Sequence, residues 1–91
     1  MIQIPGTIKA IFESKQVSDS FTTQEIALTT HEQYPQHLLI QFSNTHISHL
    51  QNCVIGQNVL VTVALQGREW TNPQGEVKYF NTIKGLSVRE M

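Results

Sequence analysis

The chain has 91 residues, a formal net charge of −1 at pH 7 and 40% hydrophobic residues. This length suits one small domain, residues 1–91, and the hydrophobic fraction is that of a globular protein, so neither a second domain nor a disordered chain is expected. The near-neutral total excludes a uniformly basic nucleic-acid-binding protein, and no apolar run reaches the ~20 residues that a membrane span requires.

The compartment is predicted from the N-terminus and from cysteine usage. The segment MIQIPG has no basic stretch before an apolar run, so we expect no secretory signal peptide. Cys53 is the only cysteine, which excludes an internal disulfide and fits a reducing compartment. We therefore predict a cytoplasmic protein without membrane contact.

Most of the chain has the alternation of apolar and polar residues that is typical of β-strands. The first segment alternates loosely, with Ile11 out of step, and Gly6 is a candidate for a bend or bulge. The third places Leu38, Ile40 and Phe42 on one face. Five strands are predicted, over residues 6–17, 21–30, 37–42, 58–67 and 77–88.

One segment between the third and fourth strands is predicted to be helical. Ile47, Leu50 and Val54 fall three and four residues apart, and Asn44 or Thr45 can cap the N-terminus. The helix is expected to have two to three turns at most and to end before Gly56, a candidate left-handed residue.

Three strands, a short helix and two further strands are the element order of the OB-fold, a partly open Greek-key barrel that binds oligonucleotides or oligosaccharides. A sandwich normally has more strands, and an SH3-like barrel does not place a helix at this point. We therefore predict an all-β, five-stranded OB-fold barrel with one short helix between strands 3 and 4.

The loop between the last two strands is the most unusual stretch, REWTNPQGEVKYFN, residues 68–81. Its residues Asn72-Pro73-Gln74-Gly75 favour a type I turn, because Pro fixes φ at the second position and Gly tolerates a positive φ at the last. The flanking residues are thus expected to form a hairpin that projects from the barrel.

Strand parity sorts the side chains of this hairpin. Lys78, Phe80 and Lys84 share one face and Tyr79 lies on the other, while Arg68 and Trp70 share a face of the opposing strand. Aromatic rings among cations suit single-stranded nucleic acid, because rings stack on bases and cations contact phosphates. The alternative is that Trp70 packs across the hairpin on Tyr79 or Phe80 and only stiffens it.

The basic residues lie near the two ends of the sequence. No Lys or Arg occurs between Gln16 and Gly67, so one face becomes basic if the two ends meet in the fold. The alternative is a set of ordinary solubilising charges. The six residues are Lys9, Lys15, Arg68, Lys78, Lys84 and Arg89.

The stretch GREWTNPQGEVKYFNT resembles the hairpin of bacterial single-stranded DNA-binding proteins, R-x-W-T-D-x-x-G-x-x-R-Y-T-T, through Trp70, Thr71, Gly75 and Tyr79. Upstream, QHLLIQFSN is similar to the W-H-R-V-V-x-F strand of that family at His37 and Phe42. The likeness covers residues 36–88. The whole chain also resembles a compact family of bacterial and phage proteins with this OB-type core.

The resemblance implies that Trp70 and Phe42 stack on bases, with Tyr79 in a weaker role. The resemblance favours Tyr79 as the residue that faces the ligand, whereas strand parity favours Phe80. Gln36 replaces a Trp that the DNA-binding family uses, although Tyr34 lies nearby. The resemblance also implies a homo-oligomer, a dimer or tetramer. The acidic tail through which that family recruits replication partners has no counterpart in SVREM, so this recruitment is not implied.

Catalytic and metal chemistry find no support in the sequence. His46 and His49 are three apart on the predicted helix, but no Cys or second His pair completes a metal site. No G-x-S-x-G, P-loop or G-x-G-x-x-G motif is present. We predict no enzyme activity, no cofactor, no metal and no small-molecule substrate.

The sequence therefore predicts a non-catalytic single-stranded DNA-binding protein of replication, recombination or repair, and the same residues would serve RNA. Its bases would stack on Trp70 and Phe42, helped by Tyr34, Tyr79 or Phe80. The predicted phosphate contacts are Lys9, Lys15, Arg68, Lys78 and Lys84. The alternative is an OB-type protein-interaction module with weak or no nucleic-acid binding, and a third reading is an oligosaccharide binder.

Overall fold

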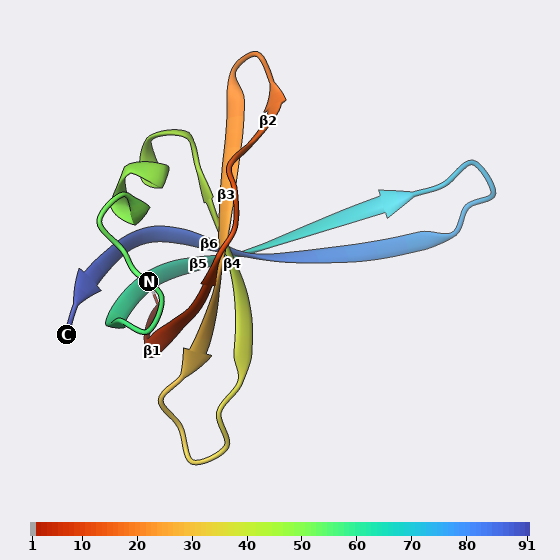
Figure 1. The fold of residues 1–91 in the computed structure, drawn as a ribbon. Helices are drawn as coiled ribbons and strands as arrows, with labels where there is room; N and C mark the ends of the chain where they lie inside the picture. The colour runs from red at the N-terminus through yellow and green to blue at the C-terminus, as the bar shows by residue number, and fades with distance from the viewer. Residues whose placement is uncertain (1) are drawn as a thin grey trace.

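The computed structural model describes residues 2–91, which form six β-strands and one short 3₁₀-helix (Figure 1). The helix, η1, lies between the fourth and fifth strands, and the all-β class predicted from the sequence is confirmed. The elements are β1 (Ile2–Ile11), β2 (Lys15–Ser18), β3 (Phe21–Thr30), β4 (His37–Ser43), η1 (Asn44–Leu50), β5 (Asn58–Thr71) and β6 (Val77–Glu90).

The sixth strand arises because the predicted first strand is interrupted. β1 pairs with β3 through a register shift between Ile8 and Ala10, and β2 resumes the pairing with β3 at Lys15. The shift explains why Ile11 is out of step with the alternation, since an extra residue moves the following side chains to the other face. The prediction of five strands is thus wrong by one, and β1 with β2 acts as one broken strand along β3.

The strand pairings close into a ring. β1 pairs antiparallel with both β3 and β5, β3 pairs with β4, and β5 pairs with β6. A short parallel pairing of Ile40 and Gln41 in β4 with Ile83 and Lys84 in β6 completes the circle. A closed order of this kind is compatible with the OB-fold expected from the sequence.

The core fills the inside of this ring. Phe42 is fully buried and its ring lies against the backbone of Gly85, where an added Cβ would come within 2.3 Å of the ring carbon Cζ. Glycine at this position is therefore what allows the ring to sit between β4 and β6. The buried apolar residues are Ile8, Ile26, Leu28, Ile40, Phe42, Leu50, Val59, Val61 and Val63.

The helix has the predicted two to three turns and ends before Gly56, but it is a 3₁₀-helix of 7 residues and so is wound more tightly than an α-helix. Its N-cap is Ser43, which makes no side-chain capping bond, and Asn44 has a positive φ of 49°. Asn44 instead accepts a hydrogen bond from the Thr22 N–H, at 3.0 Å from Oδ1, so the prediction that Asn44 or Thr45 caps the helix is wrong. Leu50 is buried, and Gly56 is left-handed as expected, with φ 92°.

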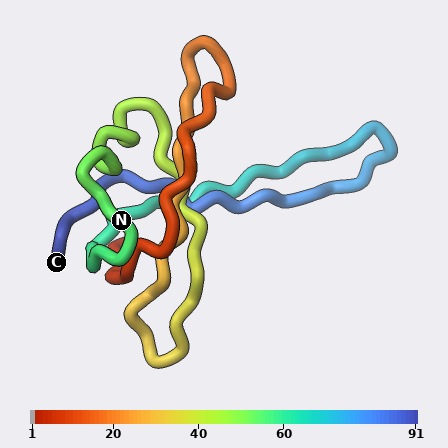
Figure 2. The backbone as a smooth tube through the Cα atoms, viewed as in Figure 1, coloured from red at the N-terminus to blue at the C-terminus, as the bar shows by residue number. Residues whose placement is uncertain are grey.

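Three hairpins project from the ring in different directions (Figures 1 and 2). They are formed by β2 with β3, by β3 with β4, and by the far halves of β5 and β6. The last is the longest, and every residue of β5 from Leu65 to Thr71 is exposed. We call residues 65–83 the arm. No helix in residues 2–91 has the length and apolar content needed to cross a membrane.

Candidate nucleic-acid interface

The turn at the tip of the arm forms as the sequence predicts. The Gly75 N–H donates to the Asn72 carbonyl at 2.9 Å, and Gly75 has φ 85°. The Asn72 side-chain oxygen also accepts from the N–H groups of Gln74 and Glu76, at 3.0 and 2.8 Å. The loop is therefore ordered by the hydrogen bonds of the Asn72 side chain and not by packing against the core.

The register of β5 and β6 divides the arm into two faces. Arg68 lies directly opposite Phe80, and Trp70 directly opposite Lys78, so these side chains share one face. Glu69 lies opposite Tyr79, which places Tyr79 on the reverse face. Of the two cross-hairpin contacts of Trp70 that the sequence left open, the pairing excludes the one with Tyr79, whereas Trp70 and Phe80 are diagonal neighbours on one face.

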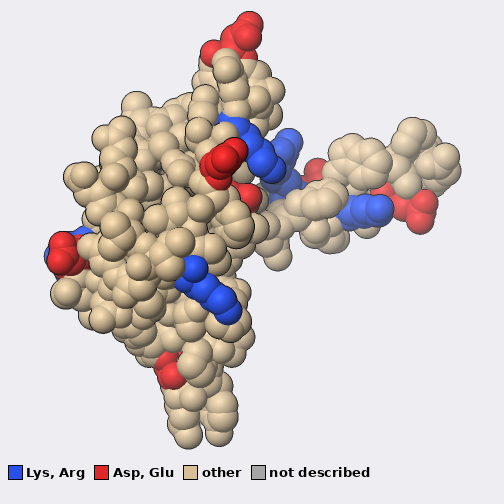
Figure 3. All heavy atoms as spheres, in the orientation of Figure 1, with Lys and Arg blue, Asp and Glu red and all other residues tan. Residues whose placement is uncertain are grey.

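The first of these surfaces, the cationic face, carries two rings and two cations. Trp70 is 50% exposed and Phe80 54% exposed, so both residues are accessible to a binding partner. Figure 3 shows Lys and Arg side chains along the arm and at the place where it meets the rest of the molecule. The residues of the cationic face are Gln66, Arg68, Trp70, Lys78, Phe80 and Thr82.

The second surface, the apolar face, continues the inner side of the ring outward. Leu65 follows the buried Val59, Val61 and Val63 in the alternation but is 68% exposed, because β5 has left the core by this point. Tyr79 is 73% exposed on the same face. The large apolar residues of this face are Leu65, Val77, Tyr79 and Ile83.

The cationic face runs on into the outer surface of the sheet. Lys84 continues it beyond Thr82 and pairs with Gln41 of β4, which in turn pairs with Glu25 of β3. Phe12, the residue after β1, donates its N–H to the Glu25 carbonyl at 3.0 Å and so lies across from it. We call Phe12, Glu25, Gln41 and Lys84 the sheet row.

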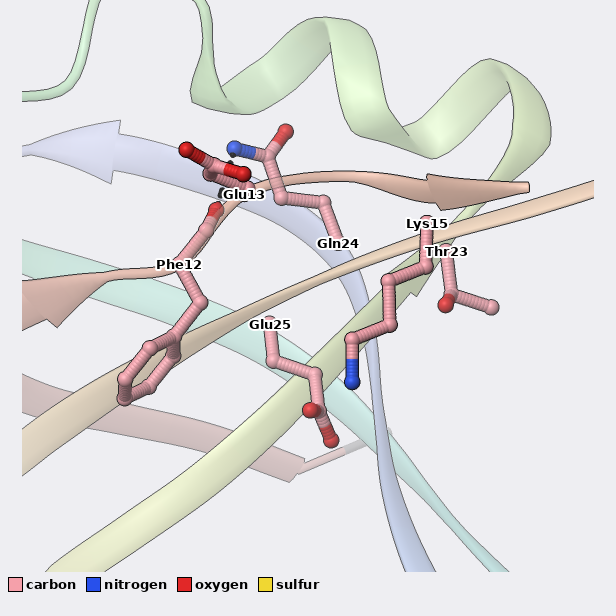
Figure 4. Close-up of a pocket in the computed structure, with 6 residues that line it drawn as sticks. All are labelled: Phe12, Glu13, Lys15, Thr23, Gln24 and Glu25. Atoms are coloured by element: carbon pink, nitrogen blue, oxygen red, sulfur yellow. Dashed lines mark hydrogen bonds between the residues drawn. The ribbon is translucent and has the colours of Figure 1, made fainter. Parts of the chain in front are cut away.

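Two hollows lie along the sheet row and share Glu25. The first lies between the end of β1, the start of β2 and β3, and is also lined by Phe12 and Lys15 (Figure 4). The second lies between β4 and the base of the arm, and is also lined by Leu39 and Gln41. A strand that followed the cationic face toward the β2–β3 hairpin would cross both.

The predicted contact residues are thus partly brought together. Trp70, Phe80, Arg68 and Lys78 share the cationic face. Lys84 extends it, and Lys15 lies across from Thr23 beside the first hollow.

Other predicted residues lie elsewhere. Phe42 is 0% exposed within the core, so its predicted stacking on bases is wrong for this fold. Tyr34 is exposed in the β3–β4 hairpin, which projects away from the arm (Figure 1). Tyr79 occupies the apolar face. Lys9 is exposed at the register shift of β1 and lines neither hollow.

Sequence reasoning missed the sheet row. Glu25 and Gln41 are ordinary polar residues on the outward side of strands, and Phe12 and Leu39 look like core residues in the sequence. Phe12 is 46% exposed and Leu39 53% exposed. The alternation of the strands predicts that Glu25 and Gln41 point outward. That they lie side by side depends on the pairing of β3 with β4, which the sequence does not show.

Two of the four histidines and the cysteine form hydrogen bonds within the fold. His31 and His37 form hydrogen bonds with Thr7 and Thr29, each at 2.9 Å. No group of three His, Cys, Asp or Glu side chains within residues 2–91 is arranged to hold a metal ion. The Cys53 thiol donates to the His49 carbonyl at 3.3 Å, and burial raises the pKa of this thiol.

Comparison with known families identifies one match that covers nearly the whole chain. The family model described as "Domain of unknown function (DUF3127)" matches residues 3–89. No curated protein matches this chain.

Proposed function

Because this chain belongs to the DUF3127 family, a domain of unknown function, we propose a function from its own geometry: it is a non-catalytic single-stranded DNA-binding protein. The observation that carries the proposal is the cationic face, where Trp70 and Phe80 are half-exposed beside Arg68 and Lys78. Rings and cations in alternation are what a flexible single strand requires, because its bases stack and its phosphates are spaced along the backbone.

The mechanism is stacking combined with charge neutralisation. Each base that stacks on an aromatic ring gains about 1–3 kcal/mol. The cations of Arg68, Lys78 and Lys84 then meet the phosphates and release their counterions. The resemblance to bacterial single-stranded DNA-binding proteins at Trp70, Thr71 and Gly75 supports the same reading, as does a pairing order compatible with the OB-fold.

The arm is suited to binding because, apart from Ile83 at its base, its side chains lie outside the core. Its residues from Leu65 to Thr71 are exposed and are therefore accessible to a ligand. A long hairpin held only at its base can close over a strand lying on the sheet. Replication, recombination and repair are the settings in which such single strands arise, and a cytoplasmic, oligomeric protein is part of this proposal.

Titration of intrinsic fluorescence tests the proposal directly. Trp70 is the only tryptophan, so its emission reports on the cationic face alone. We expect oligo-dT to quench it saturably at low salt, with weaker binding as salt is added. A folded protein that shows no quenching, and no change in the anisotropy of a labelled oligo-dT, would contradict the proposal.

The apolar face favours a second candidate function, a protein-interaction module. Leu65 and Tyr79 are exposed there on a surface continuous with the core, and exposed apolar patches commonly mark interfaces. Under this reading, Tyr79→Ala reduces self-association in light scattering or sedimentation, while binding of oligo-dT is weak in the unaltered protein. Tight, salt-dependent binding by a monomer would decide against it.

A further inference from the structure

The middle of the sheet row combines a ring, a carboxylate and an amide. Glu25 lies directly opposite Gln41 on one side and across from Phe12 on the other. Figure 4 shows the Phe12, Glu25 and Lys15 side chains extending to one side of β3, and those of Glu13 and Gln24 to the other. Lys15 and Glu25 also share a face by register, since Lys15 pairs with Thr23.

A carboxylate at this position is unusual for a surface that follows phosphates. Glu25 stands between Lys15 and Lys84, where a phosphate near it would be repelled. In Figure 4 no hydrogen bond joins its carboxylate to the other lining residues. Its oxygens only accept hydrogen bonds, so they suit an N–H donor, such as the exocyclic amine of a base, and not a phosphate.

The hollow that Glu25 shares with the base of the arm has both apolar and polar walls. The hollow between β4 and the arm has a volume of ≈ 310 Å³, near the lower end of the ~300–1,000 Å³ that small ligands occupy. Leu39 supplies an apolar wall, and Asn81 and Thr82 at the base of the arm supply further polar groups. Phe12, 46% exposed, provides a ring on the other side of Glu25.

From this arrangement we infer that the sheet row is a base-recognition site that prefers an amine-bearing pyrimidine, cytosine, over thymine. The Glu25 carboxylate accepts from the exocyclic amine of cytosine, and the Gln41 amide donates to its ring nitrogen. Glutamate acceptance from this amine is an established means of reading cytosine. Thymine presents a carbonyl oxygen where cytosine has the amine, and that oxygen faces the carboxylate unfavourably.

This inference rests on the proposed function, and the experiment separates the two. Labelled oligo-dC and oligo-dT of equal length are titrated above neutral pH, where cytosine is unprotonated, and binding is followed by anisotropy. We expect oligo-dC to bind at least roughly fivefold more tightly, the lower end of what one specific base contact supplies. In Glu25→Gln the preference should disappear, because an amide donates to the thymine carbonyl as readily as it accepts from the amine.

Glu13→Gln is the matched control. It removes the same charge from a residue that lines the first hollow, but its side chain extends to the other side of β3 (Figure 4). We expect the ratio of the two affinities to stay as in the unaltered protein.

Four results would overturn the inference. Equal affinity for oligo-dC and oligo-dT leaves the proposed function standing and removes base recognition. A preference that persists in Glu25→Gln shows that Glu25 does not read the base, and a uniform gain for both oligomers in that variant shows that it only balances the charge of Lys15 and Lys84. No binding of either oligomer by folded protein at low salt removes the proposed function and the inference together.

Discussion

At the scale of single residues, the arm separates two neighbouring aromatic side chains that sequence reasoning left undecided. Phe80 shares the cationic face with Trp70, and Tyr79 lies on the apolar face opposite Glu69. Both rings are more than half exposed. Two consecutive aromatic residues of β6 therefore lie on opposite faces of the arm.

This separation makes a matched pair of variants. Phe80→Ala should weaken oligo-dT binding roughly fivefold to a hundredfold, because one stacking platform of about 1–3 kcal/mol is lost. Tyr79→Ala should change it less than about twofold, within the spread expected of surface substitutions. Fluorescence titration of Trp70 measures both, and the reverse order of effects would place the DNA on the apolar face.

The contact between Phe42 and Gly85 predicts a second residue-scale effect. Gly85→Ala forces a methyl group against the buried ring, and we expect a loss of about 1–3 kcal/mol in the free energy of unfolding. Gly67→Ala is the control, since a Cβ there meets only the Asn81 side-chain oxygen at 3.7 Å. Urea denaturation distinguishes them, and equal stability of the two variants would mean that the core tolerates the extra group.

At the scale of elements, the arm is held by its own hydrogen bonds and by its turn. Asn72 supplies the turn with two side-chain acceptor bonds and a donor bond to the Glu76 carboxylate at 2.9 Å. The strand residues that flank the turn, 65–71 and 77–81, are exposed and do not pack against the core. The order of the arm should thus be separable from the stability of the ring.

Asn72→Ala tests this independence. We expect amide exchange in the arm to accelerate, while the free energy of global unfolding changes by no more than about 0.5 kcal/mol. Gln74→Ala is the control. Gln74 donates to Asn72 only through its backbone N–H, and alanine keeps that group. Exchange measured by mass spectrometry resolves the arm from the ring, and equal acceleration in both parts would show that the arm supports the whole fold.

At the scale of the whole molecule, a near-neutral chain places four of its six Lys and Arg residues along one route, which Glu25 interrupts. Arg68 and Lys78 lie on the arm, Lys84 at its base, and Lys15 beside the first hollow. Arg89 is paired with Leu60 near the C-terminal end of β6, away from the arm (Figure 1). Net charge therefore says little here about affinity for nucleic acid.

The salt dependence of binding should reflect this route. If each of the four cations meets one phosphate, the logarithm of the binding constant falls with the logarithm of salt at a slope of about −3. Lys78→Gln should reduce the slope by about 0.7, and Arg89→Gln should leave it unchanged. Titrations over a series of salt concentrations measure the slope, and an equal change in the two variants would refute a localised route.

The sequence by itself determined what depends on neighbouring residues. Alternation located the strands and placed Phe42 on the same face as Ile40, so its burial was readable before the family resemblance assigned it to bases. The turn at Asn72 to Gly75 was also local, since it depends on the φ preferences of Pro and Gly. The parity of Lys78 and Phe80 followed from the pleat alone.

Only the tertiary structure decided how distant segments meet. The divided first strand, the departure of Leu65 from the core and the sheet row depend on pairings between strands far apart in the sequence. Phe12, Glu25, Gln41 and Lys84 become neighbours because four strands align in one register. A shift of two residues in any of these pairings would keep each side chain on its outward face but separate the four neighbours, and local alternation does not distinguish such registers.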